Sequence, residues 1–293
     1  MYWYGLFMML ALSAGLFISL RVARWHKIQK DVVYDLFFYL VVFGFLGARL
    51  FYILYNFNYF WQNPLDVFKI WQGGIAIHGA LIFGVLVLWR FARNLVLQKI
   101  KCSDKTPLNR QYPAMPSDST LLRQSFRNDV KNWFWKLAAI IAPGVVLGQA
   151  IGRWGNYFNQ ELFGLPTALP WGIPISLANR PPEFEMFEYF HPTFLYESIG
   201  NFIIFIILLA MHWRVNRKTE HIINNTDNDA SYAKIAISYL LLYSVLRFFI
   251  EFLRIDKTAG SIFGVRMTQS LSFLVIIACV GYLFYFVTKR KYK

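Results

Sequence analysis

The chain has 293 residues, of which 57% are hydrophobic and 19% aromatic. This composition is too apolar for an ordinary soluble domain and is typical of a membrane protein with several spans. The formal net charge of +14 suits either nucleic-acid binding or basic cytoplasmic loops, and the positions of the lysines and arginines decide between the two.

Seven apolar segments approach the roughly 20 residues that a helix needs to cross a bilayer. The first begins in "MYWYGLFMML", which lacks the basic n-region of a cleaved signal peptide, and we interpret it as a retained span. The fourth is short, and Pro143 is expected to kink it. We therefore expect an all-α polytopic membrane protein that forms one integral membrane domain over residues 1–293. Its predicted spans are 3–20, 33–54, 75–97, 137–152, 193–211, 235–253 and 267–287.

The basic residues separate cleanly between alternate loops. Four lysines and arginines follow the first span, ten lie between Arg90 and residue 136, four follow the fifth span and four lie in the C-terminal tail. The other loops hold one, two and three. Since basic residues concentrate in cytoplasmic loops, this pattern predicts an external N-terminus and a cytoplasmic C-terminus. It also accounts for most of the basic excess without nucleic acid.

Two connecting segments differ in composition. Residues 98–136 are polar, basic and poor in helix signals, which predicts a partly disordered cytoplasmic insertion loop. Residues 152–192 contain aromatic, proline and acidic residues, which favours a small folded extracytoplasmic cap. The two cysteines, Cys102 and Cys279, lie in a polar loop and an apolar run, so that neither a disulfide nor a metal site is expected from them.

Polar side chains fall near the outer ends of five predicted spans, where they are costly and usually face the bundle interior or a water-filled cavity. The last four of them lie on the sixth span at offsets of 0, 4, 8 and 11, which makes one stripe on a helix, and Arg247 and Glu251 are spaced to form an ion pair. The residues of this layer are Tyr4, Arg49, His78, Arg153, Tyr243, Arg247, Glu251 and Arg254.

Each of these residues also has a purely structural interpretation. Arg49 and Arg254 are placed to snorkel to the lipid headgroups, and Arg247 with Glu251 is compatible with a structural pair. His78, alone, is more typical of a satisfied core histidine, and Asn156 and Asn159 are compatible with a helix cap.

The convergence of these groups in one layer favours a ligand. The planar fork of arginine binds phosphate in a bidentate manner, and a histidine exchanges a proton near neutral pH. A phosphate binder with a proton acceptor at the outer face of a membrane indicates chemistry on a phospholipid.

The stretch "GRWGNYFNQELFG" that follows the fourth span resembles the signature of the prolipoprotein diacylglyceryl transferase family, close to G-R-x-G-N-F-x-N-x-E-x-x-G. Tyr157 replaces the usual phenylalanine, and Ala80 stands where the family has the second glycine of His-Gly-Gly. Further stretches agree in order along nearly the whole chain: "WYGL", "GARLFYILYN", "HGAL", "HPTFLYE" and "YSVLRFFIEFLR". The residues that match the signature are Gly152, Arg153, Gly155, Asn156, Asn159, Glu161 and Gly164.

The resemblance implies an enzyme of the bacterial inner membrane that transfers the diacylglyceryl group of phosphatidylglycerol to the lipobox cysteine of a prolipoprotein. The product is a thioether, and glycerol phosphate leaves. The implied roles are His78 as base or organiser of the base, Arg153 and Arg247 as catalytic phosphate binders, and Glu251 as orienter of Arg247. Residues expected to contact or shape the substrate site also include Tyr4, Arg49, Asn156, Asn159, Glu161, Gly164, Tyr243 and Arg254. No metal and no cofactor are expected.

Two other classes of function remain as alternatives. A transporter or flippase would use the polar layer as a substrate site, but it predicts inverted repeats and a site near the bilayer midplane, and the chain shows no internal repeat. A non-enzymatic scaffold or receptor would not need arginines buried near a histidine. Mass spectrometry of a prolipoprotein incubated with phosphatidylglycerol discriminates between these possibilities.

Overall fold

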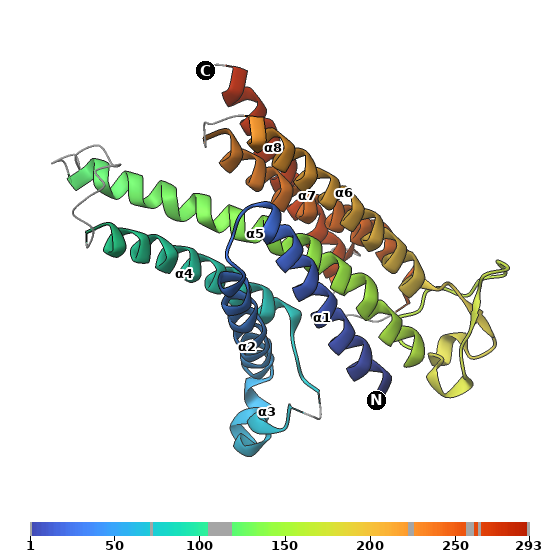
Figure 1. Cartoon of the computed structure of the whole chain (residues 1–293). Coiled ribbons are helices and arrows are strands. Elements are labelled where there is room, and N and C mark those ends of the chain that lie inside the picture. Colours follow the sequence, from blue (N-terminus) through green and yellow to red (C-terminus); the bar gives the residue numbers. More distant parts are fainter. Residues whose placement is uncertain are drawn as a thin grey trace. The chain divides into compact units, whose positions relative to one another are not determined.

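The computed structural model describes residues 2–70, 73–104, 119–221, 226–255, 261–262 and 265–291. The fold is almost entirely helical (Figure 1), and strands occur only as short pairs, β1 (Ile173–Pro174) with β2 (Tyr189–Phe190) and β3 (Ser261–Ile262) with β4 (Val265–Arg266). The α-helices are α1 (Tyr2–Trp25), α2 (Lys30–Tyr55), α3 (Phe57–Gln62), α4 (Ile77–Asp104), α5 (Ser119–Phe158), α6 (Thr193–His221), α7 (Thr226–Glu251) and α8 (Met267–Lys291).

Every predicted span coincides with a helix, which confirms an all-α polytopic membrane protein. Within the described parts of the chain, six helices are long and apolar enough to cross a bilayer, namely α1, α2 and α4 to α7. Helix α8, which holds the predicted seventh span, carries a shorter apolar stretch, Thr268–Phe284. The direction in which the helices cross the membrane stays a prediction.

The fourth span was predicted too short. It is the end of α5, which has 40 residues and continues through Pro143. The prediction failed because it required apolar residues, whereas the preceding segment is a polar helix whose apolar residues recur every four positions at Leu122, Phe126, Val130 and Phe134.

The predicted loop 98–136 is therefore also wrong over most of its length. Residues 98–104 belong to α4 and residues 119–136 to α5, while residues 105–118 lie outside the described residues. The cap is shorter than predicted as well, because α5 runs on to Phe158 and leaves residues 159–192 between α5 and α6. On which side of the membrane these segments lie stays a prediction.

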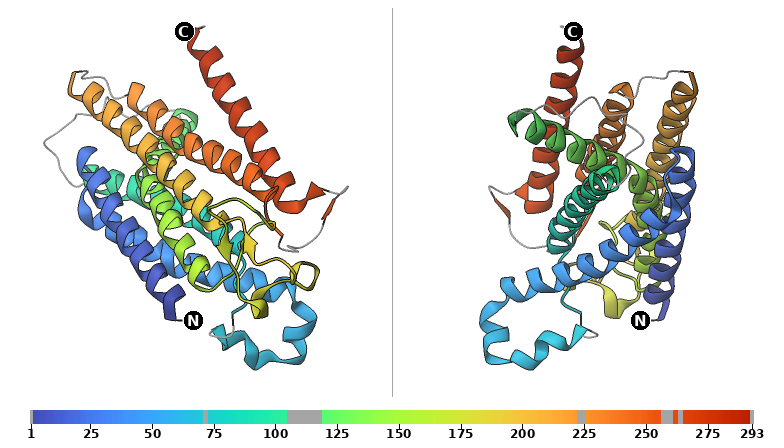
Figure 2. Two further views of the ribbon diagram at one scale, coloured as in Figure 1. Left: turned by 90° about the vertical axis from the view of Figure 1, so that its right-hand side faces the viewer. Right: turned by 60° about the vertical axis from the view of Figure 1, so that its left-hand side comes forward.

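The chain forms two compact units, which are described separately. One comprises Lys27–Ala138, where α2 packs along α4 and the connection between them contains α3 and the 3-10 helix η1 (Pro64–Phe68) (Figure 2). The other comprises Met1–His26 with Ala139–Lys293, where α7 packs against both α6 and α8. The second unit contains most of the residues that the sequence placed in a site.

Helices α1 and α5 meet closely in this second unit. A side chain at Gly144 would lie 2.4 Å from the carbonyl oxygen of Gly15, and one at Gly15 would lie 3.1 Å from that of Gly144. Small residues permit such a backbone approach, which gives transmembrane helices their van der Waals contact. The contact holds the part of α5 that carries Arg153 against α1.

The segment between α5 and α6 is folded, as its composition predicted. Strands β1 and β2 pair antiparallel, with Ile173 opposite Phe190, and cover a small core of Phe163, Ile175 and Phe190. Two 3-10 turns, η3 (Leu177–Asn179) and η4 (Pro182–Phe184), complete this cap.

Candidate active site

Glu197, in the first turns of α6, lies at the centre of an arginine cluster. Its Oε2 atom is 2.7 Å from Nη2 of Arg153 on α5, and its Oε1 atom is 2.7 Å from Nη1 of Arg247 on α7. Nη1 of Arg254, just after α7, lies 3.7 Å from the same Oε1. One carboxylate thus joins three guanidinium groups that come from sequence positions up to 101 residues apart, from 153 to 254.

Helix α7 supplies a second carboxylate. Nη2 of Arg247 lies 3.1 Å from Oε2 of Glu251, one turn later, which confirms the predicted pairing of these residues. Arg247 is therefore oriented by two carboxylates, one from its own helix and one from α6. Tyr243, Arg247 and Glu251 of the predicted stripe lie on α7, whereas Arg254 lies beyond the end of the helix and reaches the cluster from the following turn.

The charge balance of the cluster favours an anion. Within the described part of the chain, three arginines and two glutamates, Glu197 and Glu251, leave a net charge of 3 − 2 = +1. The carboxylates are almost completely buried, at 4% and 1% side-chain exposure. A cluster of this sign, with two accessible guanidinium groups, suits an anionic ligand.

The arginines differ in how far they are accessible. The side chains of Arg153 and Arg247 are 19% and 17% exposed, whereas that of Arg254 is 3% exposed. The 2.7 Å contact between Arg153 and Glu197 is an ion pair without an aligned hydrogen bond, because Oε2 of Glu197 accepts none from the described residues. A guanidinium has five N–H donors, and Arg153 is thus best placed to donate to a ligand.

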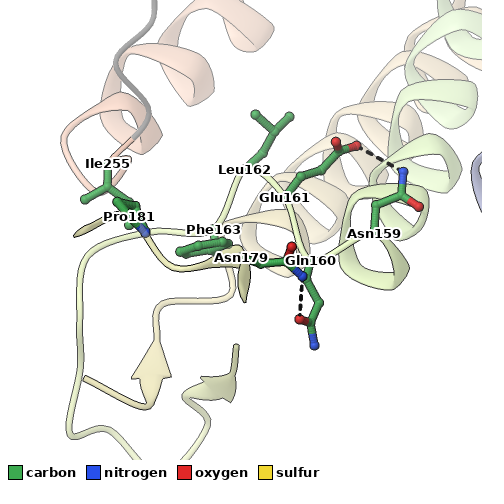
Figure 3. Close-up of a pocket in the computed structure, with 8 residues that line it drawn as sticks. All are labelled: Asn159, Gln160, Glu161, Leu162, Phe163, Asn179, Pro181 and Ile255. Carbon is green, nitrogen blue, oxygen red and sulfur yellow. Dashed lines mark hydrogen bonds between the residues drawn. The ribbon is translucent and has the colours of Figure 1, made fainter. Parts of the chain in front are cut away.

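Residues at the end of α5 form a second polar group. Nδ2 of Asn156 donates to Oε1 of Glu161 at 2.8 Å, and the backbone N–H of Glu161 donates to the carbonyl of Asn156. Nδ2 of Asn159 reaches the same Oε1 at 3.4 Å (Figure 3). The two side chains thus bind the Glu161 carboxylate and no helix carbonyl, so that they fix the start of the cap to the end of α5 without being helix caps themselves.

Three further predicted residues take supporting positions. Gly164 has no room for a side chain, which would lie 2.8 Å from both Cβ of His191 and the carbonyl oxygen of Leu253, so that it joins the cap to the end of α7. Tyr4 packs on α5 at Gly155. Tyr243 lies one turn before Arg247 and stacks on Tyr239.

Arg49 belongs to the other unit and is buried. It donates from Nε to the carbonyl of Val67 at 3.1 Å, from Nη1 to Gly73 and Gly74 at 2.8 and 3.1 Å, and from Nη2 to Asp66 at 2.6 Å. This arginine holds the connection between α2 and α4 by its backbone, which replaces the snorkelling alternative. Its predicted contact with substrate stays untested.

His78 lies in the first turn of α4, in the same unit as Arg49. Its side chain is exposed, and its ring packs against Phe51 with a centroid distance of 5.7 Å. Among the described residues it has no hydrogen-bond partner, so it is not the satisfied core histidine that its sequence context allowed. Its role as base stays a prediction.

Sequence reasoning missed Glu197 itself. The residue lies in "HPTFLYE", a stretch that carries part of the family resemblance. The signal was present, because a carboxylate in the first turns of a predicted span lies at the level of the arginines on neighbouring spans. Asn201, one turn after Glu197 on α6, was also missed. It is completely buried, and no described residue hydrogen-bonds either of its amide atoms, so the polar face of α6 continues beyond Glu197.

Comparison with known proteins identifies the family. The family described as prolipoprotein diacylglyceryl transferase matches residues 1–106 and 121–285. Similar proteins named phosphatidylglycerol–prolipoprotein diacylglyceryl transferase occur in Parasynechococcus marenigrum, with 36% identity over 94% of this chain and 86% of the relative, and in Trichormus variabilis, with 35% identity over 98% and 86%. That of Synechocystis sp. is 36% identical over 98% of this chain and 86% of its own length.

Proposed function

This chain belongs to the prolipoprotein diacylglyceryl transferase family, and we propose that its arginine cluster binds the phosphate of phosphatidylglycerol during transfer of the diacylglyceryl group to a prolipoprotein. The activity is that of a transferase in lipoprotein maturation, as in the relatives. It forms a thioether on the acceptor cysteine and releases glycerol phosphate.

The net charge of the cluster is the observation that carries this proposal. The phosphodiester of phosphatidylglycerol bears one negative charge, which matches the single positive charge left by three arginines and two glutamates. The partly exposed Arg153 and Arg247 supply the hydrogen-bond donors to the phosphate. The buried Arg254 contributes its positive charge through its ion pair with Glu197. Arginine forks bind phosphate oxygens in pairs, which orients the lipid as well as holding it.

The reaction then proceeds by displacement at carbon. The cysteine thiolate attacks the diacylglyceryl carbon that is bonded to the phosphate oxygen, a C–S bond forms, and the C–O bond breaks with its electron pair remaining on glycerol phosphate. The leaving group gains a negative charge, which Arg153 and Arg247 stabilise. Loss of one such donor typically raises a barrier by about 2.7–4 kcal/mol.

The acceptor thiol must lose its proton before attack, since a free cysteine has a pKa of about 8.5. We assign this step to His78, directly or through a group that it organises, because its ring is exposed and has no hydrogen-bond partner among the described residues. The corresponding test replaces His78 with glutamine and measures the dependence of transfer on pH. A profile with unchanged shape and height would remove His78 from the mechanism.

The partners and the location follow from the same proposal. The acceptor is a prolipoprotein whose lipobox cysteine follows a signal peptide, and the lipid enters sideways from the bilayer. We place the chain in the inner membrane of a bacterium with the cluster toward the outer leaflet. The unequal distribution of basic residues supports this orientation.

The decisive experiment is mass spectrometry of a lipobox peptide incubated with the purified protein and phosphatidylglycerol. We expect a mass gain of one diacylglyceryl unit on cysteine and the release of glycerol phosphate. Arg153→Ala should abolish most of the gain, while Arg214→Ala, which removes an exposed arginine at the far end of α6, serves as a matched control. The proposal would be refuted if the peptide stayed unmodified in the presence of phosphatidylglycerol and correctly folded protein.

A further inference from the structure

A pocket lies beside the arginine cluster, in the cap. It has a volume of about 380 Å³, within the range of about 300–1,000 Å³ that is usual for ligand sites. All of its lining residues come after the end of α5 at Phe158 or after the end of α7 at Glu251, and therefore lie outside the predicted spans. They are Asn159, Gln160, Glu161, Leu162, Phe163, Asn179, Pro181 and Ile255 (Figure 3).

The lining of this pocket does not suit an anionic headgroup. Among the described residues that line it there is neither lysine nor arginine, and the charged one is the acidic Glu161. Three amide side chains, of Asn159, Gln160 and Asn179, lie on one side, while Phe163, Pro181 and Ile255 lie on the other (Figure 3). Amides pair with the N–H and C=O groups of a peptide backbone, and the apolar wall accepts side chains.

The backbone of the pocket is strained. Gln160 and Leu162 have φ angles of 52° and 58°, and within the described residues the only other non-glycine residue with a positive φ is Lys27. Such conformations cost free energy and cluster at functional sites. The surrounding structure maintains them, because Oε1 of Gln160 accepts hydrogen bonds from the backbone N–H of Ser176 at 3.0 Å and from Asn179 at 2.9 Å, and Thr193 donates to the carbonyl of Leu162.

The pocket wall is joined directly to the cluster. Ile255 follows Arg254 in the chain, and the N–H of Leu165 donates to the carbonyl of Leu253 at 2.7 Å. Glu161 is paired with Asn156, one turn after Arg153. A polypeptide in the pocket would therefore be held at a fixed place relative to the phosphate-binding arginines.

We propose that this pocket binds the acceptor polypeptide, at the residues that follow its reacting cysteine. The inference rests on the proposed function, in which the cysteine of the acceptor reaches the arginine cluster near the C-terminal end of α5. From there the acceptor chain continues out of the bilayer and reaches the cap, where the described lining of the pocket offers amide partners for a peptide backbone. The cluster thus binds the lipid, and the pocket binds the peptide.

A pocket-filling variant tests this assignment by kinetics. Pro181 has φ −63° and ψ 145°, which any residue adopts, so that Pro181→Trp fills the pocket without a change of backbone. Leu177→Trp places the same side chain on a residue of the same loop that is 62% exposed and does not line the pocket. We expect Pro181→Trp to raise the KM for a lipobox peptide by about tenfold or more, equal to about 1.4 kcal/mol, with the KM for phosphatidylglycerol unchanged.

Two outcomes of the kinetic experiment would contradict the assignment of the pocket to the acceptor peptide. A raised KM for phosphatidylglycerol with an unchanged KM for the peptide would make the pocket a lipid site, and unchanged values for both would leave it without a role in binding either substrate. Leu177→Trp should behave as the wild type.

Cross-linking of the unaltered protein provides a second measurement that does not depend on the folding of a variant. A lipobox peptide with a photoreactive residue two positions after cysteine should attach to residues 159–163 or 179–181. Attachment elsewhere, in a protein that modifies the peptide, would overturn the pocket assignment alone. A protein that leaves the peptide unmodified would instead overturn the proposed transferase function.

Discussion

At the scale of the residue, the shared carboxylate of Glu197 is the strongest constraint on the site. Glu197→Gln keeps the shape of the side chain but leaves three arginines with one carboxylate, Glu251. Breaking a buried ion pair in this way typically costs about 3–5 kcal/mol, because the remaining charges lose their partner. We expect a clear fall in the melting temperature in detergent together with loss of transfer.

The matched control for this variant is Glu185→Gln, which removes the same charge from an exposed position in the cap. It should leave both the melting temperature and the rate of transfer near those of the wild type. A Glu197→Gln protein that melts and reacts normally would show that the cluster does not need its central carboxylate.

Substitutions of the exposed and of the buried arginine should have different effects on catalysis and on stability. Arg153→Lys retains the charge but loses the planar fork, and its side chain is the most exposed of the three. If it donates to the departing phosphate, the kcat of transfer should fall by about 10²–10³ with little change in stability. Arg254→Lys, at a buried position, should instead lower the melting temperature. Equal effects of the two variants on kcat would contradict this division.

Asp66, in the connection between α2 and α4, provides a prediction of pH dependence outside the spans. Hydrogen bonds from Lys69 and Tyr59 lower the pKa of the Asp66 carboxyl, with Nζ of Lys69 and the hydroxyl of Tyr59 each 2.6 Å away. A lowered folded-state pKa contributes stability that is present above the unfolded value, about 3.9, and is lost as the pH falls through the folded value.

The measurement compares melting temperatures of wild type and Asp66→Asn between pH 3 and pH 8. The difference should be small, because the partners Lys69 and Tyr59 are open to solvent, and constant above about pH 5. It should disappear at the acid end of the range. A difference that instead grows as the pH falls would show that the carboxylate is not the stabilising form.

At the scale of the element, apolar length was enough to predict the positions of the spans but not the ends of the helices. Helix α5 extends far beyond its apolar part because a helix needs only one apolar face, and a test for membrane insertion does not detect a polar amphipathic segment. The same dependence on apolar context decided which site residues the sequence made visible. Arg153, Arg247 and Glu251 were found because charges in apolar runs stand out, whereas Glu197 was not chosen because it lies beside the polar cap sequence.

Two buried histidines, His26 and His212, join helices of the second unit. Nε2 of His212 on α6 donates to the carbonyl of Ala139 at 3.0 Å, its Nδ1 accepts from Nε2 of His26 at 2.8 Å, and the hydroxyl of Tyr232 is 3.0 Å from Nδ1 of His26. This chain of contacts holds both imidazole rings in place through their ring nitrogens. It connects α5, α6 and α7 to the residue that follows α1.

The substitution His212→Leu removes the middle of this chain and leaves His26 and the Ala139 carbonyl without that partner. Each buried polar group that loses its partner costs about 1–3 kcal/mol, so the melting temperature should fall. Because these residues lie far along α6 from Glu197, the KM values for both substrates should stay unchanged at a temperature where the variant is folded. An unchanged melting temperature would show that the histidines contribute no stability.

At the scale of the whole molecule, the function depends on the side of the membrane to which the cluster faces. Glu185 in the cap and Arg214 near the end of α6 lie at opposite ends of one span, because the apolar part of α6, Thr193–Arg217, has 25 residues and is about 37 Å long at 1.5 Å per residue. A reagent that does not cross membranes must therefore reach only one of these two positions from outside the cell.

The test places single cysteines at these positions in a background with Cys102→Ser and Cys279→Ser that retains transfer. Basic residues concentrate on the side of Arg214, so Glu185→Cys should be labelled in intact cells and Arg214→Cys only after permeabilisation. The acceptor cysteine of an exported protein emerges on the outer face, and the lipid phosphate must be held there as well. Labelling in the reverse order would place the arginines on the cytoplasmic side, and an exported acceptor would then be unable to reach them.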